Sequence, residues 1–102
     1  MDRAAAARLD VMAVTDHDTT AAVAGVRAAA HARGIEVIAG IEISAVEDGR
    51  DVHILGYFID PGHAPLAGFL ARQRTQRIAR VTAIGDRLAQ LGMPIDIVPL
   101  VA

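Results

Sequence analysis

One segment of the chain reads Ala13-Val14-Thr15-Asp16-His17-Asp18-Thr19-Thr20. An apolar run from Leu9 to Val14 leads directly into two carboxylates that flank an imidazole, and an alanine-rich helical pattern follows. A strand that ends in Asp-His-Asp and turns into a helix brings metal-type ligands to the edge of a sheet or barrel, where α/β folds place their sites. Oxygen and imidazole ligands without sulfur indicate Mn, Fe, Zn or Mg rather than a thiolate site.

Two simpler interpretations of this segment compete with a metal site. Asp18 or Thr19 is expected to cap the following helix in any case, because such side chains accept hydrogen bonds from free helical N–H groups. The residues before them would then be ordinary polar residues of a loop. Short motifs often mislead when they stand alone. The metal interpretation therefore depends on two residues further along the chain, Glu42 and His53.

Composition limits the classes of protein to which the chain can belong. Its 102 residues suffice for one domain with a modest core, and 53% of them are hydrophobic, although only 3% are aromatic. The core must therefore consist of Val, Ile and Leu, as in a parallel sheet buried on both faces. The absence of cysteine excludes disulfides and thiolate metal sites. A formal net charge of −2 gives no reason to expect general affinity for nucleic acids or anionic membranes.

Nothing in the sequence indicates a membrane or secreted location. No apolar run approaches the length of a membrane span, and the N-terminus lacks the apolar core of a secretory signal. We therefore expect a cytoplasmic protein.

The first third of the chain predicts a βαβ unit. Residues 1–8 are expected to be the end of a helix, 9–14 a buried strand, 20–33 a helix and 35–38 a second strand. Gly34 stands where a helix with a left-handed C-cap would end. The crossover between the two strands is expected to be right-handed, which makes the strands parallel.

A hairpin is predicted next. Gly40 is expected to break or bend the second strand, after which residues 41–46 alternate with Glu42 and Ser44 on one face. Residues 47–50 form a turn, and residues 52–58 return as a strand that carries His53, Leu55 and Tyr57 on one side. Such a hairpin would bring Glu42 and His53 to one end of the sheet.

The last third of the chain predicts a helical segment. Residues 60–65 form a loop, and residues 66–91 follow a helical pattern that Gly92 and Pro94 end. The tail, residues 95–102, is apolar and contains no residue pattern that would end an element, so we expect a further element to follow it. His31 and His63 lie outside the other motifs, and we expect both to be surface residues.

Three segments, in this order and at these intervals, resemble the PHP family of metal-dependent phosphoesterases, named after polymerases and histidinol phosphatase. They are Ala13-Val14-Thr15-Asp16-His17-Asp18-Thr19, then Val37-Ile38-Ala39-Gly40-Ile41-Glu42-Ile43-Ser44, then Asp51-Val52-His53-Ile54-Leu55-Gly56-Tyr57-Phe58. The resemblance covers roughly residues 9–91 and is closest to the small stand-alone members that act on nucleotides and RNA ends. Three motifs in order are far more specific than one.

The resemblance implies a fold and a set of ligands. The fold would be α/β, part of a distorted (β/α)₇ barrel made of the βαβ unit and the hairpin, with a helical insertion. Residues 1–62 would belong to the barrel and residues 63–102 would begin the insertion or cap. Glu42 would bridge two metals, His53 would bind one of that pair and His17 a third; Asp16 would be a ligand or would orient an imidazole. Manganese is the first expectation for the metal, with zinc or iron as alternatives.

The chain also departs from the family pattern. The family's first motif, a His-x-His followed by Ser-Asp-Gly, should precede Leu9, and no histidine occurs in residues 1–8. The later barrel histidine and the final Asp-x-His should follow Ala102. The sequence therefore resembles the second and third blocks of a family domain, and we expect the isolated chain to be inactive.

The sequence alone also permits simpler interpretations of Glu42, His53 and the arginines. Glu42 could be a solvated strand residue and His53 a histidine satisfied within its strand. The arginines of residues 66–91 could form a solvated helix face, an interpretation that we slightly favour. Alternatively, Arg77 and Arg80 would reach substrate phosphates from a cap over the barrel mouth.

The expected function is hydrolysis of phosphate esters of nucleotides or nucleic-acid 5′ ends, with Glu42, His17 and Asp16 in the catalytic centre. The alternatives are a non-catalytic metal-binding remnant and a structural PHP module of a DNA polymerase. The substrate would be a phosphorylated small molecule, a nucleotide or an RNA or DNA end, and no membrane partner is expected. Exposed strand edges of an incomplete barrel would also permit self-association.

Overall fold

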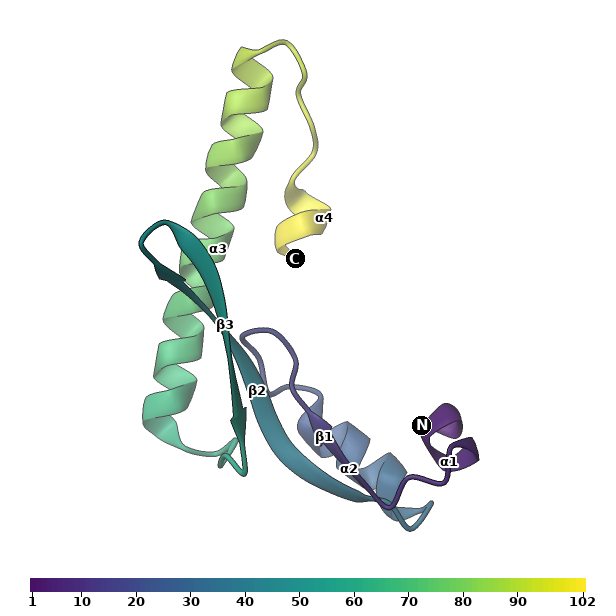
Figure 1. Cartoon of the computed structure of the whole chain (residues 1–102). Helices are drawn as coiled ribbons and strands as arrows, with labels where there is room; N and C mark the ends of the chain where they lie inside the picture. Colours follow the sequence, from purple (N-terminus) through teal and green to yellow (C-terminus); the bar gives the residue numbers. More distant parts are fainter. The chain divides into compact units, whose positions relative to one another are not determined.

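A computed structural model describes all residues, 1–102, of the chain. Its elements are α1 (Asp2–Ala6), β1 (Val11–Val14), α2 (Val23–His31), β2 (Glu36–Glu47), β3 (Arg50–Tyr57), α3 (Ala64–Gln90) and α4 (Val98–Val101) (Figure 1). The chain forms two compact units, Met1–Ala67 and Gly68–Ala102. The first unit holds the three-stranded mixed sheet, in the order β1-β2-β3.

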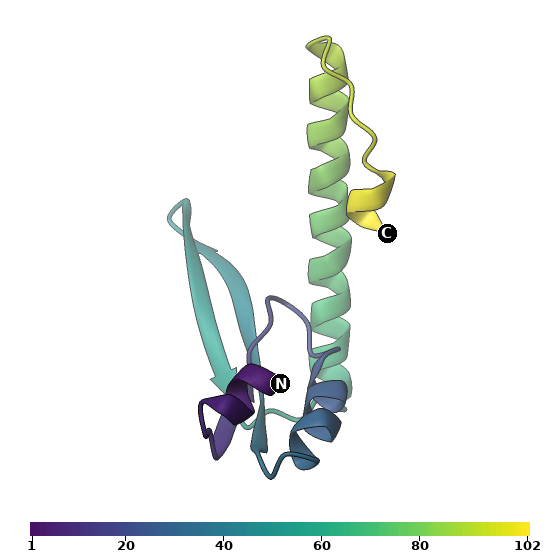
Figure 2. The ribbon, with the colours of Figure 1, turned by 90° about the vertical axis from the view of Figure 1, so that its right-hand side faces the viewer.

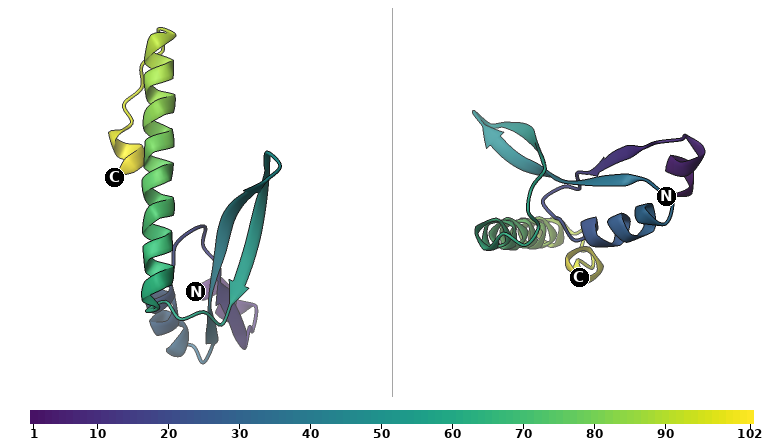
Figure 3. Two further views of the ribbon diagram at one scale, coloured as in Figure 1. Left: turned by 90° about the vertical axis from the view of Figure 1, so that its left-hand side faces the viewer. Right: turned by 90° about the horizontal axis from the view of Figure 1, so that it is seen from below.

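The predicted βαβ unit is present. β1 pairs in parallel with the first part of β2, with Val11 opposite Glu36 and Val14 opposite Ala39. Opposite residues share a face of the sheet, so Met12 and Val14 lie on the same face as Val37 and Ala39. Within the first unit, α2 lies along one side of this sheet, as the view from below shows (Figure 3).

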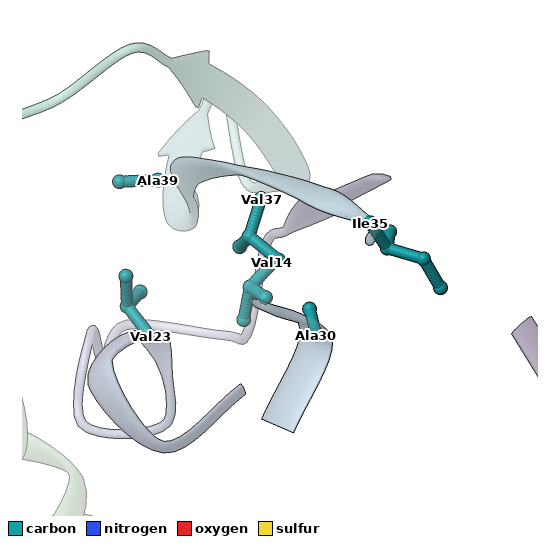
Figure 4. Packing of buried hydrophobic residues seen from close by; sticks show 6 residues of the cluster. All are labelled: Val14, Val23, Ala30, Ile35, Val37 and Ala39. Carbon is teal, nitrogen blue, oxygen red and sulfur yellow. The ribbon is translucent and has the colours of Figure 1, made fainter. Parts of the chain in front are cut away.

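The core lies between α2 and the sheet. Its buried members come from β1, α2, β2 and the residue before β2, and are Val14, Val23, Ala30, Ile35, Val37 and Ala39. Figure 4 shows Val14 and Val37 pointing to the side where Val23 and Ala30 lie. Val and Ile are present as expected, but two alanines and no leucine complete the cluster. The expectation of a parallel sheet buried on both faces was wrong, because β3 is antiparallel to β2 and most of its residues are exposed. The face with the even-numbered residues of β2 lies on the other side of the sheet.

β2 is one continuous strand of 12 residues, so of the two expected effects of Gly40, a break or a bend, the break does not occur. Instead, β2 changes its partner at this residue: Ala39 pairs with β1, and Gly40 pairs with Tyr57 of β3. A Cβ atom at Gly40 would lie 2.8 Å from the Gly56 carbonyl oxygen and 2.9 Å from that of Val14. Glycine is needed here because backbone from both sides comes this close, not because the chain turns.

The hairpin of β2 and β3 has the predicted turn. Glu47 pairs with Arg50, so two residues, Asp48 and Gly49, connect the strands. Their φ angles are +49° and +74°, as a type I′ turn requires, and Asp-Gly is a preferred sequence for that turn. The two strands form a long twisted ribbon that extends beyond β1 (Figure 2).

The start of α2 differs from the prediction. The helix begins at Val23 rather than at residue 20, and its N-cap position is Ala22, which makes no side-chain capping bond. Thr19 accepts a hydrogen bond from the Ala21 N–H instead. Asp18 bonds to a different element, β2. The expectation that one of these two polar residues caps the helix was therefore wrong.

The second unit contains most of α3, the following loop and α4. A Cβ atom at Gly85 of α3 would lie 2.7 Å from Cγ2 of Ile97, which precedes α4, so this glycine lets the apolar tail approach the helix. The tail contains the short helix α4. None of the helices combines the length and apolar character needed to span a membrane.

One ion pair joins α1 to the residues after α2, and it predicts a pH dependence. The guanidinium of Arg33 donates a hydrogen bond to the Asp2 carboxylate and holds the pKa of that carboxyl below its ordinary value. A lowered folded-state pKa means that this pair stabilises the fold above the unfolded-state pKa and ceases to do so as the pH falls through the folded-state pKa. Both side chains are exposed, so the effect is small.

We expect Asp2→Asn to lower the melting temperature slightly at neutral pH and not at all in strong acid. Thermal unfolding between pH 2 and pH 7 measures the difference between the variant and the wild type. Asp86→Asn, which removes another exposed carboxylate, is the control for the change in net charge. A difference that stays constant over this pH range would contradict the assigned ion pair.

Candidate metal centre

Two imidazoles and one carboxylate meet on the surface of the first unit. Nε2 of His17 lies 3.5 Å from Oε2 of Glu42, and Nδ1 of His53 lies 3.1 Å from Oε1 of the same carboxylate. One donor atom from each of the three residues can be chosen such that all three lie within 4.8 Å of one another. The two imidazole rings are edge to face, with centroids 5.3 Å apart. The expected convergence of these three side chains is therefore observed.

The strand register explains how Glu42 and His53 meet. Ser44 is directly opposite His53, and Glu42 is opposite Leu55, so Glu42 and His53 are diagonal neighbours on one face of the hairpin. Diagonal neighbours in an antiparallel pair are within reach of long side chains. This face is opposite to the one that carries Val37 and Ala39, which belong to the core cluster with Val23 and Ala30 of α2.

His17 reaches the same place through the loop that follows β1. The loop forms an isolated parallel bridge in which His17 is opposite Glu42. The Glu42 N–H donates to the Asp16 carbonyl at 3.0 Å, and the Asp18 N–H donates to the Glu42 carbonyl at 2.8 Å. The main chain on both sides of His17 is thus bonded to one residue of β2.

The cluster is open to solvent. The side chains of His17 and His53 are 57% and 51% exposed, and that of Glu42 is 22% exposed. A ligand could therefore approach the nitrogen and oxygen atoms without a movement of the sheet. The partly covered carboxylate and the two exposed imidazoles form a shallow site, not an enclosed pocket.

The other residues that sequence reasoning selected are not members of the three-residue cluster. Asp16 is exposed and is not a member of the three-residue cluster; its main chain bonds to Glu42. Arg77 and Arg80 are exposed residues of α3 in the second unit. Their roles in catalysis or substrate binding stay predictions. His31 and His63 are exposed, as expected.

Sequence reasoning missed the contribution of two residues. Asp18 accepts a hydrogen bond from the Ser44 N–H at 2.9 Å, although it was expected at a helix cap. Gly40 lets the strands on both sides of β2 approach closely, two residues before Glu42. Asp18 directly follows the proposed ligand and has a short side chain suited to left-handed backbone, which is the signal that could have indicated its role.

The donor set has the chemistry and spacing of a site for a divalent cation. Nitrogen and oxygen ligands at about 2.0–2.2 Å from one cation lie about 3–3.5 Å from each other, similar to the two distances at Glu42. Two neutral imidazoles and a carboxylate suit Mn, Fe or Zn.

Comparisons with known proteins show which class of reaction similar proteins catalyse. The chain is 40% identical over 92 residues to a 5′-3′ exoribonuclease of Haemophilus influenzae, covering 90% of this chain and 34% of the relative. It is 40% identical over 93 residues to a 3′,5′-nucleoside bisphosphate phosphatase of Chromobacterium violaceum, covering 91% of this chain and 33% of the relative. These curated relatives are phosphoesterases. The chain spans about a third of their length, and no family model matches it.

Two solved structures resemble the fold. An amidohydrolase from Chromobacterium violaceum superposes with a TM-score of 0.82 and 39% identity, covering 92% of this chain and 33% of that protein. A protein of Bifidobacterium adolescentis, described as a metal-dependent phosphoesterase, gives a TM-score of 0.77 at 31% identity, covering 87% and 31%. The mixed α/β architecture is therefore shared with proteins of phosphoesterase and amidohydrolase type.

Proposed function

We propose that the chain is part of a PHP-type metal-dependent phosphoesterase that hydrolyses phosphate esters of nucleotides or of nucleic-acid 5′ ends. The observation that carries this proposal is that the two oxygens of the Glu42 carboxylate face different histidines: Oε2 faces His17 and Oε1 faces His53. Such a carboxylate would hold one cation beside each imidazole, which places His17 at one of the two bridged positions, whereas the resemblance to the family implied a third position for it. The phosphoesterase relatives support the same reaction class.

Each residue would have a distinct part in this site. Glu42 would offer one oxygen to each cation position and thereby set their separation. His17 and His53 would each add a neutral nitrogen, which raises affinity without adding anionic charge. When bound, divalent cations lower the pKa of a bound water and neutralise charge on the phosphoryl oxygens. The exposure of both imidazoles leaves room for a phosphate ester to approach.

The finer assignments belong to the same proposal. The βαβ unit and the hairpin would be one arc of a (β/α)₇ barrel, and residues 63–102 would begin a helical insertion. Asp16 would orient an imidazole or act as a ligand, and Arg77 and Arg80 would bind substrate phosphates. Mn²⁺ is the cation that we propose first, with Zn²⁺ or Fe²⁺ as alternatives, and we propose a cytoplasmic location.

The first test is metal binding by the 102-residue chain. We expect weak Mn²⁺ binding that His53→Gln removes and His63→Gln leaves unchanged, because only the first histidine belongs to the cluster. The electron paramagnetic resonance signal of free Mn²⁺ measures the bound fraction. The chain alone should release no phosphate from a nucleoside 3′,5′-bisphosphate, because three protein donors can hold one metal weakly but are too few to hold all the metals that the family resemblance implies. Equal Mn²⁺ binding by both variants would contradict the proposed site, and rapid turnover would contradict the expected inactivity of the chain alone.

Catalysis itself is tested in a chimera. The aligned third of the Chromobacterium violaceum phosphatase is replaced by this chain, which is 40% identical to it. If His17, Glu42 and His53 form the proposed site, the chimera should release phosphate from the bisphosphate in the presence of Mn²⁺. A folded chimera without activity would favour the non-catalytic, metal-binding alternative.

A further inference from the structure

The loop that carries His17 extends the parallel ladder of β1 beyond the end of that strand. The Glu42 N–H donates to the carbonyl of residue 16, and the N–H of residue 18 donates to the Glu42 carbonyl. In a parallel ladder, the next bond would run from the Ser44 N–H to the main-chain carbonyl of residue 18. The Ser44 N–H donates instead to Oδ1 of Asp18, at 2.9 Å. A side chain thus takes the place of a main-chain acceptor.

The backbone of Asp18 explains this exchange. Its φ angle is +54°, so the chain leaves the strand conformation at this residue and turns towards α2. Aspartate is one of the few residues other than glycine that adopt this conformation, because its short side chain can bond locally. The carboxylate lets the chain turn immediately after His17 while the ladder keeps its third bond to β2.

We propose that Asp18 is a positioning residue of the metal centre, whose carboxylate fastens the His17 loop to β2 at Ser44. The inference rests on the proposed function and adds a residue to it. His17 lies between the two bonded residues of the loop, so the bonds on either side limit where its imidazole can lie. The contact between its Nε2 and Glu42 follows from this fastening.

Asp18 has two alternative roles, and in neither would the position of His17 depend on the hydrogen bond between Ser44 and the Asp18 carboxylate. Asp18 could be present only because its backbone is left-handed, in which case glycine would serve equally well. It could also be a metal ligand, in which case an amide would bind metal poorly. A fastening role predicts a third pattern, in which asparagine suffices and glycine does not, because only asparagine keeps the acceptor oxygen.

The experiment compares Asp18→Asn and Asp18→Gly in the 102-residue chain. The metal-free readout is the nuclear Overhauser effect between the ring protons of His17 and His53, whose ring centroids lie 5.3 Å apart. The second readout is Mn²⁺ affinity. The control is Asp48→Gly, which makes the same substitution at another aspartate with positive φ, in the hairpin turn.

We expect Asp18→Asn and Asp48→Gly to keep the ring-to-ring signal and the Mn²⁺ affinity. Asp18→Gly should lose the signal and bind Mn²⁺ about 10–100-fold more weakly, the usual loss when a residue that orients a ligand is changed. A Gly variant that matches the wild type in both readouts overturns the inference, as does an Asn variant as impaired as the Gly variant. If the wild type binds no Mn²⁺ but the Gly variant still loses the ring signal, the proposed metal function fails while the fastening role stands.

Discussion

Glu42→Gln should abolish Mn²⁺ binding to the 102-residue chain and phosphate release by the chimera. Glu42 is the only carboxylate of the cluster and faces both histidines, with Oε2 near His17 and Oε1 near His53. Glutamine keeps the shape of the side chain but removes its charge and replaces one oxygen by an amide nitrogen, which carries hydrogens and cannot act as a metal ligand. If Glu42 bridges two cations as proposed, both would lose a ligand in a single substitution.

The size of this loss separates a bridging ligand from a supporting residue. Changing a residue that only orients a ligand usually costs 10–100-fold in metal affinity, so we expect a loss greater than about 100-fold here. Isothermal titration calorimetry with Mn²⁺ measures the affinity, and thermal unfolding without metal shows whether the variant still folds.

Glu36→Gln provides a matched control for Glu42→Gln. Glu36 belongs to the same strand and lies on the same face, six residues earlier, but it is not part of the cluster. This variant should bind Mn²⁺ as the wild type does. If both glutamine variants lose a similar, small amount of affinity, the effect is one of general charge, and Glu42 is not a ligand.

Gly40→Ala should strongly destabilise the fold. The added Cβ atom would meet the Gly56 carbonyl oxygen at 2.8 Å, Cγ2 of Thr15 at 2.8 Å and the Val14 carbonyl oxygen at 2.9 Å. Two of these atoms belong to backbone next to β2, so they cannot move without disturbing the pairing of the strands. Forcing an extra carbon into a tightly packed place usually costs about 1–3 kcal/mol.

The variant should also bind Mn²⁺ more weakly, because any shift of β2 at Gly40 displaces Glu42 two residues later. Urea unfolding measures the free energy of unfolding. Gly25→Ala is the control: no atom lies within 4 Å of a Cβ there, and alanine within a helix is favoured over glycine by about 0.5–1 kcal/mol. A Gly40→Ala protein as stable as the wild type would show that the two parts of the sheet are not packed as described.

Local patterns in the sequence were enough to predict most elements. The Asp48-Gly49 pair has the turn conformation that such a pair prefers, and the alternation around it placed the two strands of the hairpin. The strand before His17 and the helix after it were also predicted, although the helix begins three residues later than expected. These features depend on residues close together in the chain, so the periodicity of side chains suffices to predict them.

Contacts between distant residues needed the tertiary structure. Gly40 has the local signature of a break, yet β2 continues through it, because two neighbouring segments approach so closely that only a residue without a side chain fits. Asp18 has the signature of a helix cap, yet it bonds to Ser44, 26 residues away. In both cases the local preference was overruled by a partner that sequence spacing cannot indicate.

The candidate site shows the same division. The sequence motifs predicted that His17, Glu42 and His53 converge, although Glu42 and His53 lie within β2 and β3 and not at the strand ends. Only the tertiary structure decided that each oxygen of Glu42 faces a different histidine. That arrangement depends on the register of the hairpin and on the bridge between His17 and Glu42. A register shift of one residue would move Glu42 to the opposite face, because strand side chains alternate with a period of two.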